Sequence, residues 1–151
     1  MIYNKGYKES DLRYDEFAEF VKKNLDQFMT PYNVPDIDEY IMKLYTIGTI
    51  AYERNENNQI IAILVGYTDN TPDNNSYLTM GVVDNKYRNK GYIKKLMSYM
   101  EEVCIEKNLK GMWLVTEEEN IAAVTAYEKY GFVKDGYSDK GLLVFRKTFD
   151  L

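Results

Sequence analysis

At residues 80–97 the chain reads MGVVDNKYRNKGYIKKLM, in which a basic turn joins an apolar strand to an amphipathic helix. The first backbone N–H groups of a helix have no partner inside the helix, and the macrodipole is positive there. A phosphate group can accept hydrogen bonds from these N–H groups if the backbone comes close, which Gly91 permits. The basic side chains form a local island in a chain of net charge -5: Lys86, Arg88, Lys90, Lys94 and Lys95. The stretch therefore predicts a site for a polyanionic cofactor.

The same turn has a simpler interpretation, as a strand-to-helix connection with a solvated, lysine-rich helix start. Its single glycine, Gly91, excludes two phosphate-binding motifs, because P-loops and dinucleotide fingerprints need several glycines. The rest of the chain has to decide between the cofactor site and the plain turn.

Apolar periodicity places the turn in a chain of helices and strands. It predicts helices over 15–28, from Asp36 to Tyr45, through Ile93–Cys104 and over Asn120–Tyr130, the last stopped by Gly131. It predicts strands over Ile47–Glu53, Ile60–Thr68, Tyr77–Val83, Met112–Val115 and Leu142–Thr148. Without repeats or linkers, this order indicates a single domain over residues 1–151 of the mixed α/β (α+β) class, with helices on both faces of a mixed sheet.

The composition excludes several classes of protein. With 151 residues, of which 45% are hydrophobic and 28% charged, the chain can bury a sizeable core. The net negative charge argues against a nucleic-acid partner. The absence of histidine excludes a Ser-His-Asp hydrolase and a histidine-ligated metal. A general base would have to be a carboxylate, a tyrosine or an ordered water.

Other features favour a cytoplasmic location and argue against a membrane protein. No apolar run approaches the ~20 residues that a membrane span needs, and the first residues lack a signal-peptide pattern. Cys104 is the only cysteine, so no intrachain disulfide can form.

Two motifs resemble those of the GNAT acetyltransferase superfamily. Residues 88–93, RNKGYI, resemble its Arg/Gln-x-x-Gly-x-Gly/Ala pyrophosphate loop, and residues 80–84, MGVVD, resemble the strand end before that loop. Residues 120–132, NIAAVTAYEKYGF, are similar to the family signature Asn-x-x-Ala-x-x-x-Tyr-x-x-x-Gly-Phe. Ile93 departs from the pattern, because the family usually has Gly or Ala there, and a β-branched side chain narrows the approach.

The resemblance implies a GNAT acyltransferase fold with about six to seven strands, acetyl-CoA as donor, no metal, and direct transfer to a primary amine. It implies that these residues bind the cofactor: Val82, Val83, Arg88, Asn89, Lys90, Gly91, Tyr92, Ile93, Lys94, Asn120, Ala123 and Lys129. For Asn120 a helix N-cap is an equally good role, and Lys129 is read more simply as a solvated lysine. Homodimers are common in the family.

Tyr127 matches the family's tyrosine, which implies that it is the general acid. A phenol of pKa ~10 can deliver a proton to a departing thiolate of pKa ~8.5 or lower. The alternative is that Tyr127 is core, since Ala123, Ala126, Tyr127 and Tyr130 share one helical face.

The base and the nucleophile are less defined. The family often has a glutamate where Tyr77 stands here, and no carboxylate is next to it in sequence. Residues 117–119, EEE, could line the acceptor site, or Thr116 and Glu119 could form a capping box, and an ordered water could replace a base. Cys104 lies on the apolar face of the long helix, so we expect an inert thiol and no covalent acetyl-enzyme.

The acceptor is expected over the first two helices and the loop before the last strand. An acidic, aromatic rim would attract a cationic amine, unless these residues are only solvated surface: Asp15, Glu16, Asp36, Asp38, Glu39, Asp135, Asp139, Tyr14, Tyr32, Tyr40 and Tyr137. Three functions stay open: acetylation of a small-molecule amine, which we favour, acetylation of a protein or peptide amine, and non-catalytic sensing of acetyl-CoA.

Overall fold

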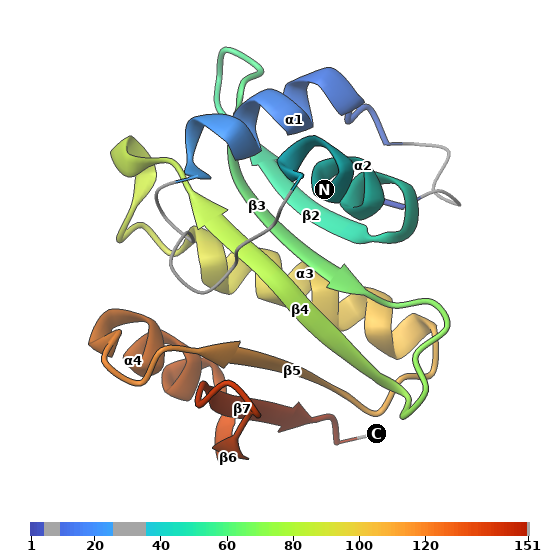
Figure 1. The fold of residues 1–151 in the computed structure, drawn as a ribbon. Helices are drawn as coiled ribbons and strands as arrows, with labels where there is room; N and C mark the ends of the chain where they lie inside the picture. The colour runs from blue at the N-terminus through green and yellow to red at the C-terminus, as the bar shows by residue number, and fades with distance from the viewer. Residues whose placement is uncertain (5–9, 26–35, 151) are drawn as a thin grey trace.

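The computed structural model describes residues 1–4, 10–25 and 36–150, which form a seven-stranded sheet with helices on both faces (Figure 1). The helices are α1 (Tyr14–Lys23), α2 (Ile37–Ile47), α3 (Tyr92–Glu106) and α4 (Ile121–Tyr130), with a 3-10 turn η2 (Asn85–Tyr87). The strands are β1 (Ile2–Tyr3), β2 (Thr49–Arg54), β3 (Ile60–Tyr67), β4 (Asn75–Val83), β5 (Gly111–Thr116), β6 (Val133–Tyr137) and β7 (Leu143–Thr148). Their order in the sheet is β1-β2-β3-β4-β5-β7-β6.

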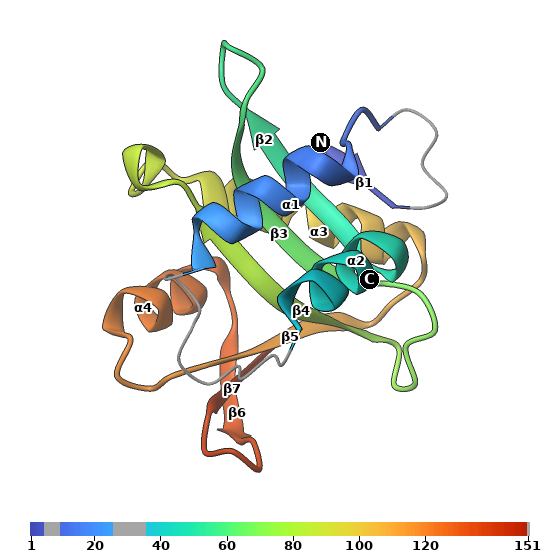
Figure 2. The same cartoon turned by 45° about the horizontal axis from the view of Figure 1, so that its top comes forward.

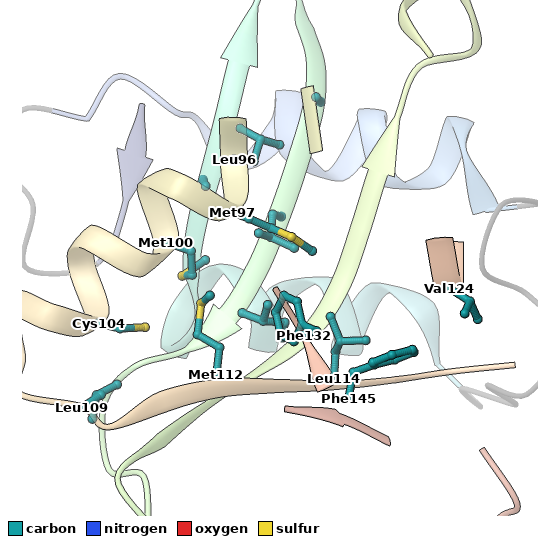
Figure 3. Packing of buried hydrophobic residues seen from close by; sticks show 14 of the residues in the cluster. Leu96, Met97, Met100, Cys104, Leu109, Met112, Leu114, Val124, Phe132 and Phe145 are labelled. Atoms are coloured by element: carbon teal, nitrogen blue, oxygen red, sulfur yellow. The ribbon is translucent and has the colours of Figure 1, made fainter. Parts of the chain in front are cut away.

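Two apolar clusters hold the helices to the sheet. Helices α1 and α2 lie on one face, where Phe17 and Ile41 pack against strand residues such as Ile63. Helix α3 lies on the opposite face, as Figure 2 shows, and Leu96, Met97, Met100 and Cys104 share a buried cluster with Val124 of α4 and Phe132 (Figure 3). The predicted fold class is thereby confirmed.

Local sequence signals explain most helix boundaries. Helix α2 begins after Asp36, whose Oδ1 accepts a hydrogen bond from the Glu39 N–H at 3.1 Å. Helix α1 begins after Arg13, whose N–H donates to Glu16 Oε2 at 2.9 Å. The helix predicted over 15–28 ends at Lys23, and its residues 26–28, with Pro31 and Pro35, lie outside the described residues.

Three features differ from the sequence prediction. Ile47 ends α2 instead of starting a strand, because the Gly48 N–H continues the helical pattern by donating to the Leu44 carbonyl at 2.9 Å. Strand β1 has two residues and exists through its pairing with β2. Strand β6 is an edge strand with every residue exposed, so it lacks the alternation that predicts a half-buried strand.

The sheet divides between β4 and β5. These strands pair in parallel only where Asn75–Tyr77 faces Gly111–Trp113, and they separate toward their carboxyl ends (Figure 1). A β-bulge lies just past the last pair, since Val65 faces Met80 and Gly66 faces Leu78, which leaves Thr79 without a partner residue in β3. The bulge reverses the facing of β4: Leu78 packs on the α3 side, whereas Met80 packs on the α1 and α2 side.

Leu96 tests the α3 contact. We expect Leu96→Ala to lower the free energy of unfolding by about 2–5 kcal/mol, because the side chain is fully buried and leaves a cavity. Ile105→Ala in the same helix is the matched control, since Ile105 is 40% exposed; its cost should stay below about 1 kcal/mol. Urea unfolding measures both, and equal losses would show that α3 does not depend on this contact.

Candidate functional site

The turn after β4 has an unusual backbone that exposes the start of α3. Asp84 accepts a hydrogen bond from the Lys86 N–H through Oδ1 at 3.1 Å and so holds η2. Asn89 and Gly91 then adopt left-handed conformations, with φ of 61° and 82°. The first intrahelical bond of α3 joins the Lys95 N–H to the Gly91 carbonyl at 3.1 Å. The N–H groups of residues 92–94 precede that bond and form the positive end of a 15-residue helix.

Tyr87 stabilises this turn through contacts with Tyr92, Lys90 and Asn55. Its ring packs edge-on against Tyr92 with centroids 6.1 Å apart, and the Lys90 ammonium lies 5.6 Å from the Tyr87 ring centroid. The Asn55 side chain donates to the Tyr87 hydroxyl at 3.2 Å, which connects the turn to the β2–β3 hairpin. Arg88 Nε donates to the Val83 carbonyl at 3.4 Å and ties the turn to the end of β4.

A cavity of about 470 Å³ opens between this turn, β4 and α4. Its lining is mainly apolar, with the cations Arg88, Lys94 and Lys129 among the residues around it. Lys95 is not among them, because its ammonium lies 3.4 Å from Glu53 Oε1 and 6.0 Å from the Tyr99 ring centroid. Of this basic island, Arg88 and Lys94 thus border the cavity, whereas Lys95 contacts Glu53 of β2.

The cavity brings together most of the predicted site residues: Val83, Arg88, Asn89, Gly91, Tyr92, Ile93, Lys94, Ala123, Tyr127 and Lys129. Val82 packs its side chain on the opposite face of the sheet, Lys90 lies over Tyr87, and Asn120 caps α4 by accepting from the Ala123 N–H at 3.2 Å. These three side chains do not line it. The sequence analysis missed six lining residues as site residues: Gly81, Tyr87, Met97, Ala122, Ala126 and Tyr130. Gly81 and Ala122 could have been noticed as small residues beside the two motifs.

Ile93 is the second residue of α3, and its side chain packs against the protein while it lines the cavity. It is half-buried against the α3-side cluster, and its Cδ1 would lie 3.5 Å from a Cβ at Gly81. A Cβ at Gly81 would thus only touch Ile93 at an ordinary contact distance, and the cavity is open beside Ile93.

Tyr127 lies where α4 meets the cavity. Its ring packs edge-on against Phe132 and Phe145, with centroids 6.1 and 5.9 Å away, so the side chain is held by the core while it lines the cavity. The Tyr127 side chain is thus part of the core and part of the cavity lining. One turn later, Tyr130 packs under the Lys147 ammonium at 4.5 Å, and Lys147 pairs with Glu101 of α3 at 2.6 Å.

The glutamates after β5 do not form the expected capping box. Helix α4 begins at Ile121 with Asn120 as its cap, so Thr116 lies five residues before the first helical residue. Glu118 instead accepts a hydrogen bond from the Tyr137 hydroxyl at 2.5 Å, and this contact raises the pKa of Tyr137. The three exposed glutamates belong to the connection between β5 and α4.

Most of the predicted acidic rim is engaged in ion pairs. Glu16 pairs with Arg54 at 2.7 Å, which holds the pKa of that carboxyl below its usual value, and Asp38 pairs with Lys22. Asp15 pairs with Arg13 at 3.2 Å and Asp135 with Arg146 at 2.9 Å. Tyr14 packs on Tyr45, and Tyr32 lies outside the described residues. The rim is therefore a poor source of attraction for a cationic amine.

Comparison with known proteins identifies the class of this site. The model described as the acetyltransferase (GNAT) family matches residues 14–132. The chain belongs to this family, and it is an acyltransferase that uses acetyl-CoA. No helix in the described part of the chain has both the length and the apolar character to cross a membrane.

Three relatives illustrate the similarity. N-alpha-acetyltransferase 30 of Saccharomyces cerevisiae is 27% identical over 85% of this chain and 76% of its own. A Bacillus anthracis structure described as a streptothricin acetyltransferase with acetyl coenzyme A is 31% identical, over 75% of this chain and 68% of the other, with a TM-score of 0.63. One chain of the NatC complex bound to Gag peptide and CoA is 25% identical to this chain. The match covers 99% of this chain and 98% of the other, with a TM-score of 0.68.

The residues fit acetyl-CoA as the donor. The helix start and nearby cations suit phosphate groups, and a Cβ at Gly91 would meet nothing within 4 Å, which leaves the backbone accessible there. The apolar part of the cavity suits an uncharged arm.

Cys104 is unsuited to nucleophilic chemistry. Its side chain is fully buried in the α3-side cluster, and burial raises the pKa of the thiol to about 11. Almost no thiolate is therefore present near neutral pH.

We expect Cys104→Ser to keep turnover within about twofold, because the thiol is remote from the cavity lining. The variant should lose about 1–3 kcal/mol of stability, since a hydroxyl replaces an apolar thiol in the core. Steady-state rates and urea unfolding on the same sample separate the two effects. A folded variant without turnover would restore the acetyl-cysteine route.

Proposed function

We propose that this acetyltransferase moves the acetyl group of acetyl-CoA directly to a primary amine of a small molecule, within a single domain of residues 1–151. The observation that carries the proposal is the cavity at the start of α3, which adjoins the separated ends of β4 and β5 and has Tyr127 in its lining. The free, buried state of the only cysteine supports a reducing, cytoplasmic setting.

The turn would bind the phosphates. The N–H groups of residues 92–94 and the left-handed Gly91 present donors at the positive helix end, and Arg88, Lys94 and Lys129 add charge. Lys90 would act at longer range, from its position over Tyr87. Asn89 and Tyr92 would shape the turn itself.

The strands and α4 would hold the pantetheine arm. Beyond Tyr77 the backbone of β4 is no longer paired with β5, so groups around Val82 and Val83 are available on that edge. Ala123 is a small lining residue of α4, and Asn120 fixes the start of that helix. The bulge at Thr79 re-aims backbone groups where the strands part, which suits polarisation of a carbonyl oxygen.

Acetyl-CoA supplies an activated acetyl thioester. Tyr127 would donate its phenolic proton to sulfur as the carbon–sulfur bond breaks, while the amine nitrogen bonds to the acetyl carbon and releases a proton to solvent. The position of the family glutamate is taken by Tyr77, whose ring packs 4.4 Å from that of Trp113. We therefore assign the base to water.

A peptide amine is the second candidate acceptor. It is favoured by the similarity to N-alpha-acetyltransferase 30 and to the NatC complex bound to Gag peptide. The small-molecule acceptor is favoured by the relative described as a streptothricin acetyltransferase, at 31% identity. Labelled acetyl-CoA in a cell lysate distinguishes them, because label enters either small molecules or proteins.

Acetyl-CoA should raise the unfolding temperature of the protein. At ~100 times its dissociation constant a ligand adds about 2.7 kcal/mol, or roughly 5–10 °C for a domain of this size. Arg88→Glu should abolish most of this shift, because it places a negative charge beside the phosphates. Lys86→Glu is the charge-matched control, since Lys86 belongs to the turn but does not line the cavity. No shift at millimolar acetyl-CoA would refute the donor site.

Tyr127→Phe should lower kcat by about 100-fold, because a positioned acid typically contributes factors of this order. The shift caused by acetyl-CoA should be retained, since the ring stays in the core. Tyr130→Phe is the control: Tyr130 also lines the cavity, but its hydroxyl donates to Glu101 of α3 at 3.5 Å, so this variant should stay within about threefold. Release of free thiol with the best amine of a primary-amine panel gives the rates, and full activity of Tyr127→Phe would remove its role as acid.

A further inference from the structure

A second and larger cleft, of about 860 Å³, lies on the face of the sheet that carries α2. The end of α2, the β3–β4 connection and the paired ends of β4 and β5 surround it. Three aromatic side chains line it, Tyr67, Tyr77 and Trp113, and the carboxylates of Asp69 and Asp73 lie on its rim. This volume is ordinary for a small-molecule site.

The aromatic residues form a row across the sheet. Tyr67 of β3 faces Tyr77 of β4, Tyr77 faces Trp113 of β5, and Trp113 faces Arg146 of β7. Ring centroids are 6.5 Å apart for the tyrosine pair and 4.4 Å apart for Tyr77 and Trp113. The protein already places a cation at each end, with Lys43 Nζ 5.9 Å from the Tyr67 centroid and Arg146 5.7 Å from the Trp113 centroid. Both ends of the row therefore attract cations, and a ligand cation would compete there with Lys43 and Arg146.

One wall of the cleft reaches the point where β4 and β5 stop pairing. Tyr77 and Trp113 are the last paired residues of these strands, and they also form part of the cleft wall. Thr79, at the bulge, follows ~7 Å along β4, at about 3.3 Å per residue. The Tyr40 hydroxyl lies 3.0 Å from Thr79 Oγ1 and so joins α2 to this point. A molecule that reacts beside Thr79 would therefore have to span ~7 Å or more to place its other end next to Tyr77.

The charges at the rim also favour a cation. The Lys107 ammonium lies 2.7 Å from Asp69 Oδ1, so it holds the pKa of Asp69 below its usual range but also neutralises much of the charge of this carboxylate. The attraction of a ligand cation at the rim therefore depends on Asp73. Asp73 accepts from the Asn75 N–H at 3.2 Å through Oδ1. Helix α2 directs its negative carboxyl end here, with no basic residue in its last turn. Lys43 is the opposing charge in the lining.

We propose that this cleft binds a second cationic group of the amine acceptor, which makes the acceptor a diamine or polyamine. The inference rests on the proposed amine acetylation and assigns its substrate class. One nitrogen of the acceptor reacts at the gap between β4 and β5. The other, protonated, lies among the aromatic row and the rim carboxylates, where Lys43 competes with it.

Trp113 reports on the cleft directly, because it is the only tryptophan of the sequence and part of the lining. We would saturate the protein with coenzyme A, which permits no turnover, and titrate linear α,ω-diamines of four to eight carbons while following Trp113 emission. Monoamines of equal length are the matched ligands. At the best length, the diamine should bind about 10-fold more tightly than the monoamine.

Variants connect this preference to the cleft. Asp73→Asn keeps an oxygen for the Asn75 N–H but removes the charge, and it should weaken diamine binding about threefold while leaving monoamine binding unchanged. Lys43→Gln should tighten diamine binding about twofold. Glu102→Gln removes an exposed acid of α3, on the opposite face of the sheet and outside the cleft lining, so it is the control and should change neither ligand.

The outcomes separate this inference from the proposed function. Equal binding of diamines and monoamines, or a preference unchanged by Asp73→Asn, overturns the cleft assignment, while turnover of monoamines would leave the acetyltransferase proposal intact. Absence of any acetyl-CoA shift would instead refute the donor site. In that case the Trp113 titration of the free protein still supports or overturns the cation site.

Discussion

Three consecutive pairs between β4 and β5 hold the two parts of the sheet together, and the end of that pairing creates the site. Buried backbone groups need hydrogen-bond partners, so strands that separate inside a domain leave groups that a ligand can use. Helix α3 packs against both strands. Its residues Leu96, Met97 and Met100 share a buried cluster with Leu78 of β4 and Leu114 of β5. The cavity lined by Tyr127 and the cleft lined by Trp113 then lie on opposite faces of the sheet.

The charged side chains of this molecule form local groups whose sign differs from that of the net charge. A chain of net charge -5 collects Arg88, Lys94 and Lys129 around one cavity, next to a positive helix end. Elsewhere several of its acids pair with neighbouring cations, as in the pair between Glu16 and Arg54 that joins α1 to β2. Paired surface charges contribute little long-range field, so the net charge says little about which ligand a cavity attracts.

The two motifs, at residues 88–93 and 120–132, could be predicted from the sequence because each depends on residues close together in the chain. The turn around Gly91 and the cap at Asn120 depend on conformations that neighbouring residues determine, and the structure forms both. Strand β6 and the bulge at Thr79 were not predictable in the same way. The exposed residues of β6 form a strand through their pairing with β7. In β4 the buried residues Leu78 and Met80 are two apart, as in a regular strand, although the bulge places them on opposite faces of the sheet.

The sequence by itself determined the fold class, the donor turn and the residues of α4 that face the cavity, because helical periodicity and cap chemistry act over a few residues. Only the tertiary structure decided which charged side chains are paired within the protein. Lys95 pairs with Glu53, and Glu16 pairs with Arg54, although the partners are far apart in the sequence. It also aligned Tyr67, Tyr77 and Trp113 in one row, which requires the register of three strands. Strand register is set by packing across the whole sheet, and no short stretch of sequence contains that information.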